Sequence, residues 1–172
     1  MPHEAASVRL FLGLWPTAEV RDAVQAHAQA WQWPASARRT RLERLHVTLH
    51  FIGAVPTARL DEVRQGLAVP FAGCELLLDR MAVWPGGIAV LEAGEVPREL
   101  VQLHAALAQK LRALQLPVEE RRYRPHVTLA RKAFGARPPP DAQPLRWSAP
   151  PGYLLVESLP GGRGYAPVQV YA

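Results

Sequence analysis

The chain has 172 residues, of which 49% are hydrophobic and 20% are charged. This length suits one domain with a substantial core, and no apolar run approaches the ~20 residues of a membrane span, so we expect one soluble domain over residues 1–172. Residues 1–7 lack the basic and then apolar segments of a secretory signal, so a cytoplasmic location follows by default. The only cysteine, Cys74, cannot form an internal disulfide and is expected to be a small buried hydrophobe.

The positive charge comes almost entirely from arginine. Twenty Lys and Arg against fifteen Asp and Glu give a formal net charge of +5, and only Lys110 and Lys132 are lysines. The planar guanidinium group suits phosphate, but a GC-rich genome would produce the same bias without any ligand. A cluster before residue 46 fits either a track for an RNA backbone or a solvated basic loop. Its members are Arg38, Arg39, Arg41 and Arg44.

The first part of the chain predicts two units of a strand followed by a helix. Residues 8–15 predict a strand, and Thr17 opens an amphipathic helix that continues to residue 33. Residues 45–53 predict a second strand, and residues 57–68 predict a second helix.

The middle of the chain predicts a hairpin and then a long helix. Residues 74–84 and 88–93 predict two strands joined across Pro85-Gly86-Gly87. Residues 97–114 predict a helix with a leucine stripe, and Pro117 stops it.

The last part of the chain predicts strands around a proline-rich loop. A strand is expected at 127–132, and an exposed loop at 135–151 holds at most a short strand at 145–148. A closing hairpin is expected from strands at 153–158 and 165–171, whose glycine-rich turn is not followed by the helix that a phosphate-binding loop needs. The predicted class is α+β with mostly antiparallel strands.

One tetrapeptide occurs twice, as His46-Val47-Thr48-Leu49 and as His126-Val127-Thr128-Leu129. Because side chains alternate along a strand, each copy directs its histidine and threonine to one face and its valine and leucine into the core. Two such strands facing one another would surround a small anion with two imidazoles and two hydroxyl groups.

This set of side chains suits the cleavage of a phosphodiester. In-line displacement needs one group that deprotonates the nucleophile and another that protonates the leaving oxygen. An imidazole pKa near 6.5 allows one histidine to be neutral and the other protonated near pH 7. The threonine hydroxyls would hold the non-bridging oxygens, and nothing in this scheme requires a metal.

The sequence around both motifs resembles the 2H phosphoesterases, specifically the bacterial RNA 2',3'-cyclic phosphodiesterases once called 2'-5' RNA ligases. The resemblance rests on His46-Val47-Thr48-Leu49-His50-Phe51-Ile52-Gly53 and on Arg124-Pro125-His126-Val127-Thr128-Leu129-Ala130-Arg131. It covers nearly the whole chain, and the paired H-x-T motifs with these flanks are fairly specific. It implies a bilobal α+β fold in which two interleaved, pseudo-symmetric lobes, each with an antiparallel sheet and flanking helices, enclose a central cleft.

The resemblance also implies an activity and roles for residues. The activity is hydrolysis of a 2',3'-cyclic phosphate at an RNA end to a 2'-phosphomonoester, without metal or nucleotide cofactor, and with weak 2'-5' RNA joining in reverse. His126 would activate water and His46 would protonate the departing O3'. Thr48 and Thr128 would bind the phosphate, with Arg131 adding a cation. The expected partner is therefore RNA, with tRNA fragments as one source, and we expect a monomer with no membrane and no metal.

Four further residues have open interpretations. Strict alternation places Arg131 on the face opposite to His126 and Thr128, so a bulge or the end of the strand would be needed to turn it inward. Alternation places His50 on the face of His46, which makes it a substrate-side residue of the cleft. Phe51 could stack on a base, although most aromatic residues on strands belong to the core, and Arg41 could contact substrate. His27 and His104 lie in predicted helices without a partner at ligand spacing, and no chemistry is assigned to them.

Two other functions remain open at this stage. The motifs grip only a phosphate, so the substrate could instead be a small cyclic nucleotide or an ADP-ribose cyclic phosphate. A non-catalytic RNA-binding module is also conceivable, but binding alone would not need two titrating histidines.

Overall fold

The computed structural model describes residues 5–172. Residues 1–4, on which the expectation of no secretory signal partly rests, lie outside the described residues. The helices and strands are β1 (Ser7–Leu14), α1 (Ala18–Gln29), β2 (Arg38–Arg39), η1 (Leu42–Arg44), β3 (Val47–Pro56), η2 (Thr57–Arg59), α2 (Leu60–Gly66), β4 (Cys74–Trp84), β5 (Ile88–Ala93), α3 (Arg98–Ala113), β6 (His126–Arg131), β7 (Leu145–Ala149), β8 (Tyr153–Ser158), η3 (Pro160–Gly162) and β9 (Tyr165–Tyr171).

The strands form an antiparallel sheet in the order β7-β4-β5-β6-β3-β1-β8-β9, and β2 pairs with the edge of β6. We call β4 to β7 the first half of the sheet and β1, β3, β8 and β9 the second half. The two halves are joined between β3 and β6 by one residue pair, Val47 with Val127. The expected α+β fold with two antiparallel halves is confirmed, and the two halves share a continuous sheet.

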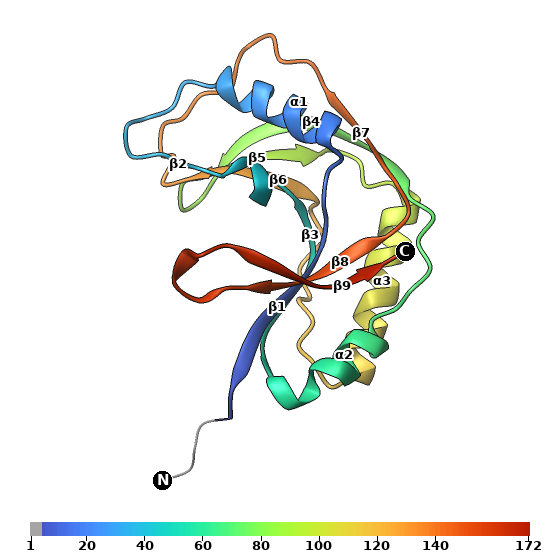
Figure 1. Cartoon of the computed structure of the whole chain (residues 1–172). Helices are drawn as coiled ribbons and strands as arrows, with labels where there is room; N and C mark the ends of the chain where they lie inside the picture. The colour runs from blue at the N-terminus through green and yellow to red at the C-terminus, as the bar shows by residue number, and fades with distance from the viewer. Residues whose placement is uncertain (1–4) are drawn as a thin grey trace.

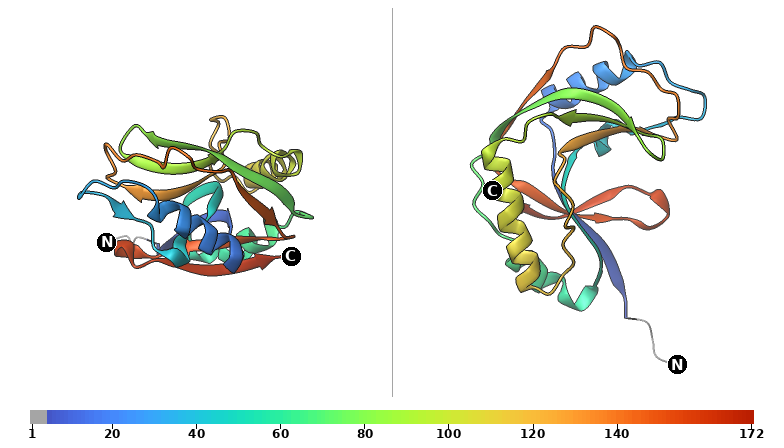
Figure 2. Two further views of the ribbon diagram at one scale, coloured as in Figure 1. Left: turned by 90° about the horizontal axis from the view of Figure 1, so that it is seen from above. Right: turned by 180° about the vertical axis from the view of Figure 1, so that it is seen from behind.

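Each half is covered by a helix that the chain brings across from the other half (Figure 1). Helix α1 follows β1 of the second half but packs against β7 of the first, whereas α3 follows β5 of the first half and packs against β3 of the second. The right-hand view of Figure 2 shows α1 over the first half and α3 along the second from behind. The leucines of α3 and of both motifs belong to one buried core, which includes Leu49, Leu107 and Leu129.

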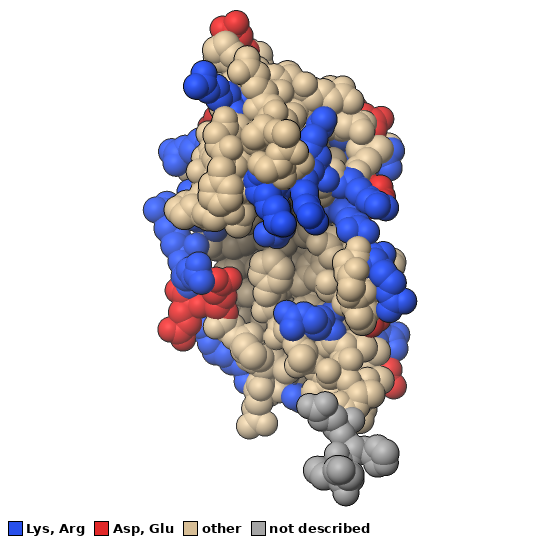
Figure 3. Space-filling view, turned by 90° about the vertical axis from the view of Figure 1, so that its left-hand side faces the viewer, with Lys and Arg blue, Asp and Glu red and all other residues tan. Residues whose placement is uncertain are grey.

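The open side of the sheet carries a hollow between the two halves (Figure 3), and Lys and Arg side chains border it. Within residues 5–172, no helix is both long and apolar enough to cross a membrane. Cys74 is buried as expected, and burial raises the pKa of its thiol to about 11.

Two of the predicted boundaries that differ from the structure have a clear cause. Helix α1 ends at Gln29 instead of residue 33, because Gln32 leaves the helix and pairs through its backbone with Arg137 at 2.9 and 3.0 Å. Strand β3 does not end at Gly53, because Gly53 takes a positive φ of 84° and the strand continues to Pro56 against β1. The two-residue strand β2, formed by Arg38 and Arg39, was not predicted.

Candidate active site

The two His-Val-Thr-Leu motifs meet where the halves of the sheet join. Val47 pairs with Val127 in antiparallel register, which places His46 opposite Thr128 and Thr48 opposite His126. Residues opposite one another share a face of the sheet. Both valines are fully buried on the core face. Two imidazoles and two hydroxyl groups therefore gather on the other face, at the open side.

The first motif ends in a β-bulge. Strand β1 pairs with Thr48 and next with His50, which leaves Leu49 as the extra residue. An extra residue reverses the alternation beyond it. His50 thus turns to the core face, where it is 3% exposed, and Phe51 returns to the face of His46, where it is 60% exposed.

The expectation that His50 lines the cleft was therefore wrong, because strict alternation ignored the bulge. Its Nε2–H donates to the backbone carbonyl of His104 at 2.8 Å, and the two rings stack with centroids 4.0 Å apart. The ring of His104 stacks in turn on Tyr123, also at 4.0 Å. His50 belongs to a buried aromatic stack between β3 and α3, and burial lowers its pKa.

The second motif has a bulge at the matching leucine. Strand β5 pairs with Thr128 and next with Ala130, which leaves Leu129 as the extra residue. Ala130 is buried on the core face, so Arg131 turns toward the face of His126. The positive charge of Arg131 lowers the pKa of both His46 and His126.

Both imidazoles are oriented in the same way. His46 Nδ1–H donates to the carbonyl of Arg44 at 2.6 Å, and His126 Nδ1–H donates to the carbonyl of Arg124 at 2.7 Å. These bonds select the tautomer in which Nε2 carries the lone pair. In His46 this Nε2 lies 3.0 Å from the hydroxyl of Thr48, which donates to it.

Aromatic rings surround His46. Trp15 stacks on it with centroids 4.6 Å apart, while Phe11 lies at 5.2 Å and Tyr165 meets it edge-on at 5.5 Å. Gly13 makes room for this arrangement, because a Cβ there would come within 3.2 Å of the Val47 carbonyl oxygen and 3.5 Å of the His46 ring. Burial lowers the pKa of His46 to about 4; the charges of His126 and Arg131 act in the same direction, whereas the Arg44 carbonyl opposes them.

His126 has more polar surroundings. Glu92 lies directly opposite it on β5, and the Glu92 carboxylate accepts hydrogen bonds from Arg124 at 2.9 and 3.2 Å. The ring of Trp84 meets His126 at 4.4 Å and carries the Arg124 guanidinium at 4.6 Å. Burial lowers the pKa of His126, while the Arg124 carbonyl and the charge of Glu92 raise it. The two histidines thus share an orientation but differ in their electrostatic environment.

Each bulge is fixed by a hydroxyl group from the segment that leads into the other motif. The Tyr123 hydroxyl donates to the Thr48 carbonyl at 2.9 Å, and the Thr40 hydroxyl donates to the Thr128 carbonyl at 2.8 Å. Sequence reasoning missed both residues, because nothing near Thr40 or Tyr123 in the sequence marks so distant a partner. The carbonyls that orient the imidazoles belong to Arg44 and Arg124, each two residues before its histidine, and a backbone acceptor leaves no mark in the sequence.

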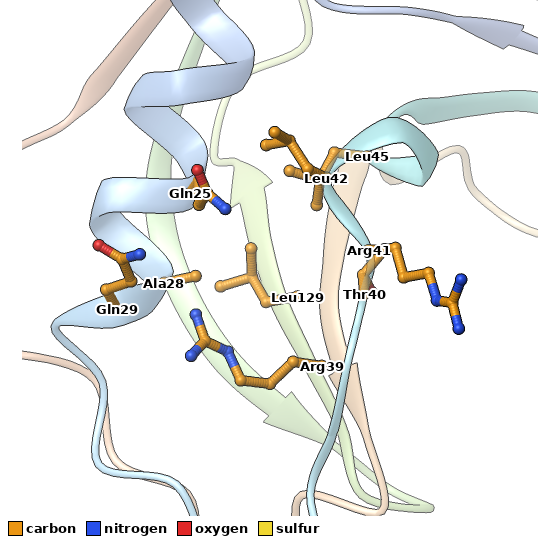
Figure 4. A pocket seen from close by; sticks show the side chains of 9 residues that line it. All are labelled: Gln25, Ala28, Gln29, Arg39, Thr40, Arg41, Leu42, Leu45 and Leu129. Carbon is orange, nitrogen blue, oxygen red and sulfur yellow. The ribbon is translucent and has the colours of Figure 1, made fainter.

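The remaining candidates lie around this site. A cavity of about 250 Å³ beneath α1 has Leu129 and Arg39 among its lining residues and none of the motif histidines or threonines. Figure 4 shows Arg39 reaching into that cavity and Arg41 pointing away from it. His27 lies in α1, where it accepts a hydrogen bond from the Trp31 indole at 2.9 Å. In the described part of the chain, no three His, Cys, Asp or Glu residues form a group that could hold a metal ion.

Comparison with known proteins gives consistent matches. The family model described as the 2'-5' RNA ligase superfamily matches residues 20–151. The RNA 2',3'-cyclic phosphodiesterase of Escherichia coli (strain K12) is 33% identical over 146 residues, which are 81% of this chain and 80% of that protein. A crystal structure described as a phosphoesterase superposes with a TM-score of 0.81 at 25% identity, over 97% of this chain and 98% of that one. The structure of E. coli LigT complexed with 3'-AMP superposes with a TM-score of 0.79 at 25% identity, over 97% of this chain and 98% of that one.

The bond from Tyr123 to the bulge predicts a loss of stability in Tyr123→Phe. Removing the hydroxyl leaves the Thr48 carbonyl without this donor, which should lower the free energy of unfolding by about 1 to 3 kcal/mol. Urea unfolding followed by fluorescence measures the change. Tyr165→Phe is the matched control, because no hydrogen bond of the Tyr165 hydroxyl is found within residues 5–172. Equal stability of the two variants would contradict the role of Tyr123.

Proposed function

Because the chain belongs to the 2'-5' RNA ligase superfamily, we propose that it hydrolyses 2',3'-cyclic phosphate ends of RNA to 2'-phosphomonoesters by acid-base catalysis with two histidines. The observation that carries this proposal is the Val47–Val127 pair, which puts both histidines and both threonines on one exposed face. The E. coli relative at 33% identity is named for RNA 2',3'-cyclic phosphodiesterase activity, which supports RNA as the substrate class.

In the proposed reaction the two Nε2 atoms act on opposite sides of the phosphorus. Neutral His126 takes a proton from water, and the water oxygen forms a bond to phosphorus. The bond between phosphorus and O3' breaks, and protonated His46 gives its proton to O3'. The product keeps its phosphate on O2', and His46 is left neutral and His126 protonated. Proton exchange with solvent then restores the starting forms.

The other site residues would stabilise the charge that develops on the phosphate. The Thr48 and Thr128 hydroxyls lie on the same face as both imidazoles and can donate to the non-bridging oxygens. Arg131 follows the bulge at Leu129 and so turns toward the face of His126, where its guanidinium would add a positive charge for the phosphate.

Substrate binding would also set the protonation state of the acid. Without a ligand, burial keeps both imidazoles mostly neutral near pH 7, and the effect is strongest at His46. A cyclic phosphate carries a negative charge, which favours the imidazolium form of a nearby histidine. The bound cyclic phosphate would thus raise the pKa of His46 and favour the protonated form that acts as the acid.

Phe51 and Arg41 would contact the rest of the RNA. Phe51 lies opposite Phe11, on the face of the histidines, and its ring is mostly exposed, so a base can stack on it. Arg41 is exposed in the basic segment before the first motif. With a 5'-hydroxyl of a second RNA in place of water, the same steps would form a 2'-5' bond, and the fragments of a cleaved tRNA would supply both ends. One chain holds every residue used here, so a monomer suffices.

Removal of either histidine tests the mechanism. His46→Ala and His126→Ala should each lower kcat for a 2',3'-cyclic mononucleotide by about 10²- to 10⁴-fold while RNA binding persists, and the wild type should stay fully active in EDTA. His27→Ala, on the outer helix α1, should keep wild-type activity. Steady-state kinetics with circular dichroism as a check on folding decides the matter. Full activity in both single variants would contradict the proposal.

The lowered pKa values predict an acidic optimum of kcat/KM. The rate should rise with pH as the base loses its proton and fall as the acid loses its own, so the maximum lies between the two free-enzyme pKa values. Both lie below 6.5, that of His46 at about 4. The maximum for a cyclic mononucleotide should therefore lie below pH 6.5. A maximum above pH 7 would show that at least one imidazole is not lowered as described.

A further inference from the structure

A second basic pocket lies beside His46 on the open face of the sheet. Its volume is about 380 Å³, and its lining includes Arg41, Arg44 and Arg163. Trp15 and Tyr165 line it as well, and these are two of the rings that surround His46. The pocket therefore adjoins the aromatic rings that surround His46.

The register of the strands places the floor of this pocket on the catalytic face. Val156 of β8 lies opposite Phe11, and Leu154 lies opposite Gly13, which itself lies opposite Thr48. Opposite residues share a face. A ligand can thus extend from the histidines over β1 to β8 without crossing the sheet.

The charges of the pocket favour an anion. Three guanidinium groups face one carboxylate, that of Glu43. Among residues 5–172, no carboxylate forms an ion pair with Arg41, Arg44 or Arg163. Arg44 donates to the Gly162 carbonyl at 3.2 Å and Arg163 to the Pro160 carbonyl at 3.0 Å. Each guanidinium has five N–H donors, so most of them are left for a ligand.

Arg41 points to this side of its segment. Figure 4 shows its side chain directed away from the cavity under α1, opposite in direction to that of Arg39. The chain thus sends alternate arginines to the two sides of the segment, and Arg41 joins the pocket beside His46.

We propose that this pocket binds the phosphodiester group that precedes the cyclic end of an RNA chain. The inference rests on the proposed function, because the cyclic phosphate must first sit between the histidines. A ribose whose O2' and O3' are held there can continue into the chain only through O5'. The guanidinium groups then bind the next phosphate, and the rings of Trp15 and Tyr165 lie beside the sugar and base. The site is built for chain ends, and free cyclic nucleotides fill only part of it.

Three substrates test the pocket: adenosine 2',3'-cyclic phosphate, the same nucleotide with a 5'-phosphate, and the dinucleotide ApA with a 2',3'-cyclic end. The wild type should show kcat/KM about tenfold or more higher for the dinucleotide than for the nucleotide without a 5'-phosphate, with the 5'-phosphorylated form between them. The slope of log kcat/KM against log salt should be steeper for the dinucleotide by about 0.7.

The variant Arg163→Gln should lower this advantage by about threefold or more and leave hydrolysis of the nucleotide without a 5'-phosphate within about twofold of the wild type. Arg44 is kept, because it ties the β8–β9 turn to the first motif. Arg146→Gln is the control for net charge, since Arg146 is exposed on β7, at the far end of the sheet from β9. It should behave as the wild type with all three substrates.

The outcomes separate the inference from the proposed function. If the wild type has equal kcat/KM for the mononucleotide and the dinucleotide, the proposed role of the pocket is wrong, and the proposed hydrolase function still stands. An equal loss on both substrates in Arg163→Gln, or the same loss in Arg146→Gln, would also overturn it. Absence of hydrolysis of all three substrates would overturn the proposed function and the pocket with it.

Discussion

The backbone pairing of Val47 with Val127 is the constraint on which the site depends. Antiparallel pairing at this one position places the two histidines and the two threonines of the motifs on one face, because side chains alternate on either side of a paired residue. Each motif strand then has a bulge against its outer neighbour, at Leu49 against β1 and at Leu129 against β5. Hydroxyl groups of Tyr123 and Thr40 hold the carbonyls next to each bulge. The site is thus a short junction whose geometry the backbone sets.

Near-symmetric backbones here produce two unlike histidines. His46 stacks on Trp15 and is surrounded by aromatic rings, whereas His126 lies opposite Glu92 on the neighbouring strand. A backbone carbonyl accepts the Nδ1–H bond of each imidazole, so the two rings have the same orientation. Their pKa values differ because their other neighbours differ. The difference arises from neighbours outside the repeated tetrapeptide, on or next to β1 for His46 and on β5 for His126.

Much of the fold was readable because apolar alternation and turn residues are local signals. The strand pattern, the long helix ending before Pro117 and the convergence of the two motifs all depended on them. His50 was misplaced for a definite reason, since a bulge at a leucine leaves the hydrophobic pattern unchanged and yet reverses everything after it. The same device turns Arg131 to the face that strict alternation denied it. Thr40 and Tyr123 act across the two halves, and so distant a contact leaves no mark on the residues around either one.

The exchange of helices between the halves bears on the order in which the molecule can assemble. Since α1 covers the half of the sheet to which β1 does not belong, and α3 covers the half to which β5 does not belong, neither half can bury its apolar face with a contiguous stretch of chain. Collapse of one half alone leaves apolar surface exposed, and contacts between residues far apart in the sequence must form before either half is covered. A nascent chain that has released only its first histidine motif therefore has no finished module to fold. The two motifs can meet only once the second has emerged and both crossings are complete.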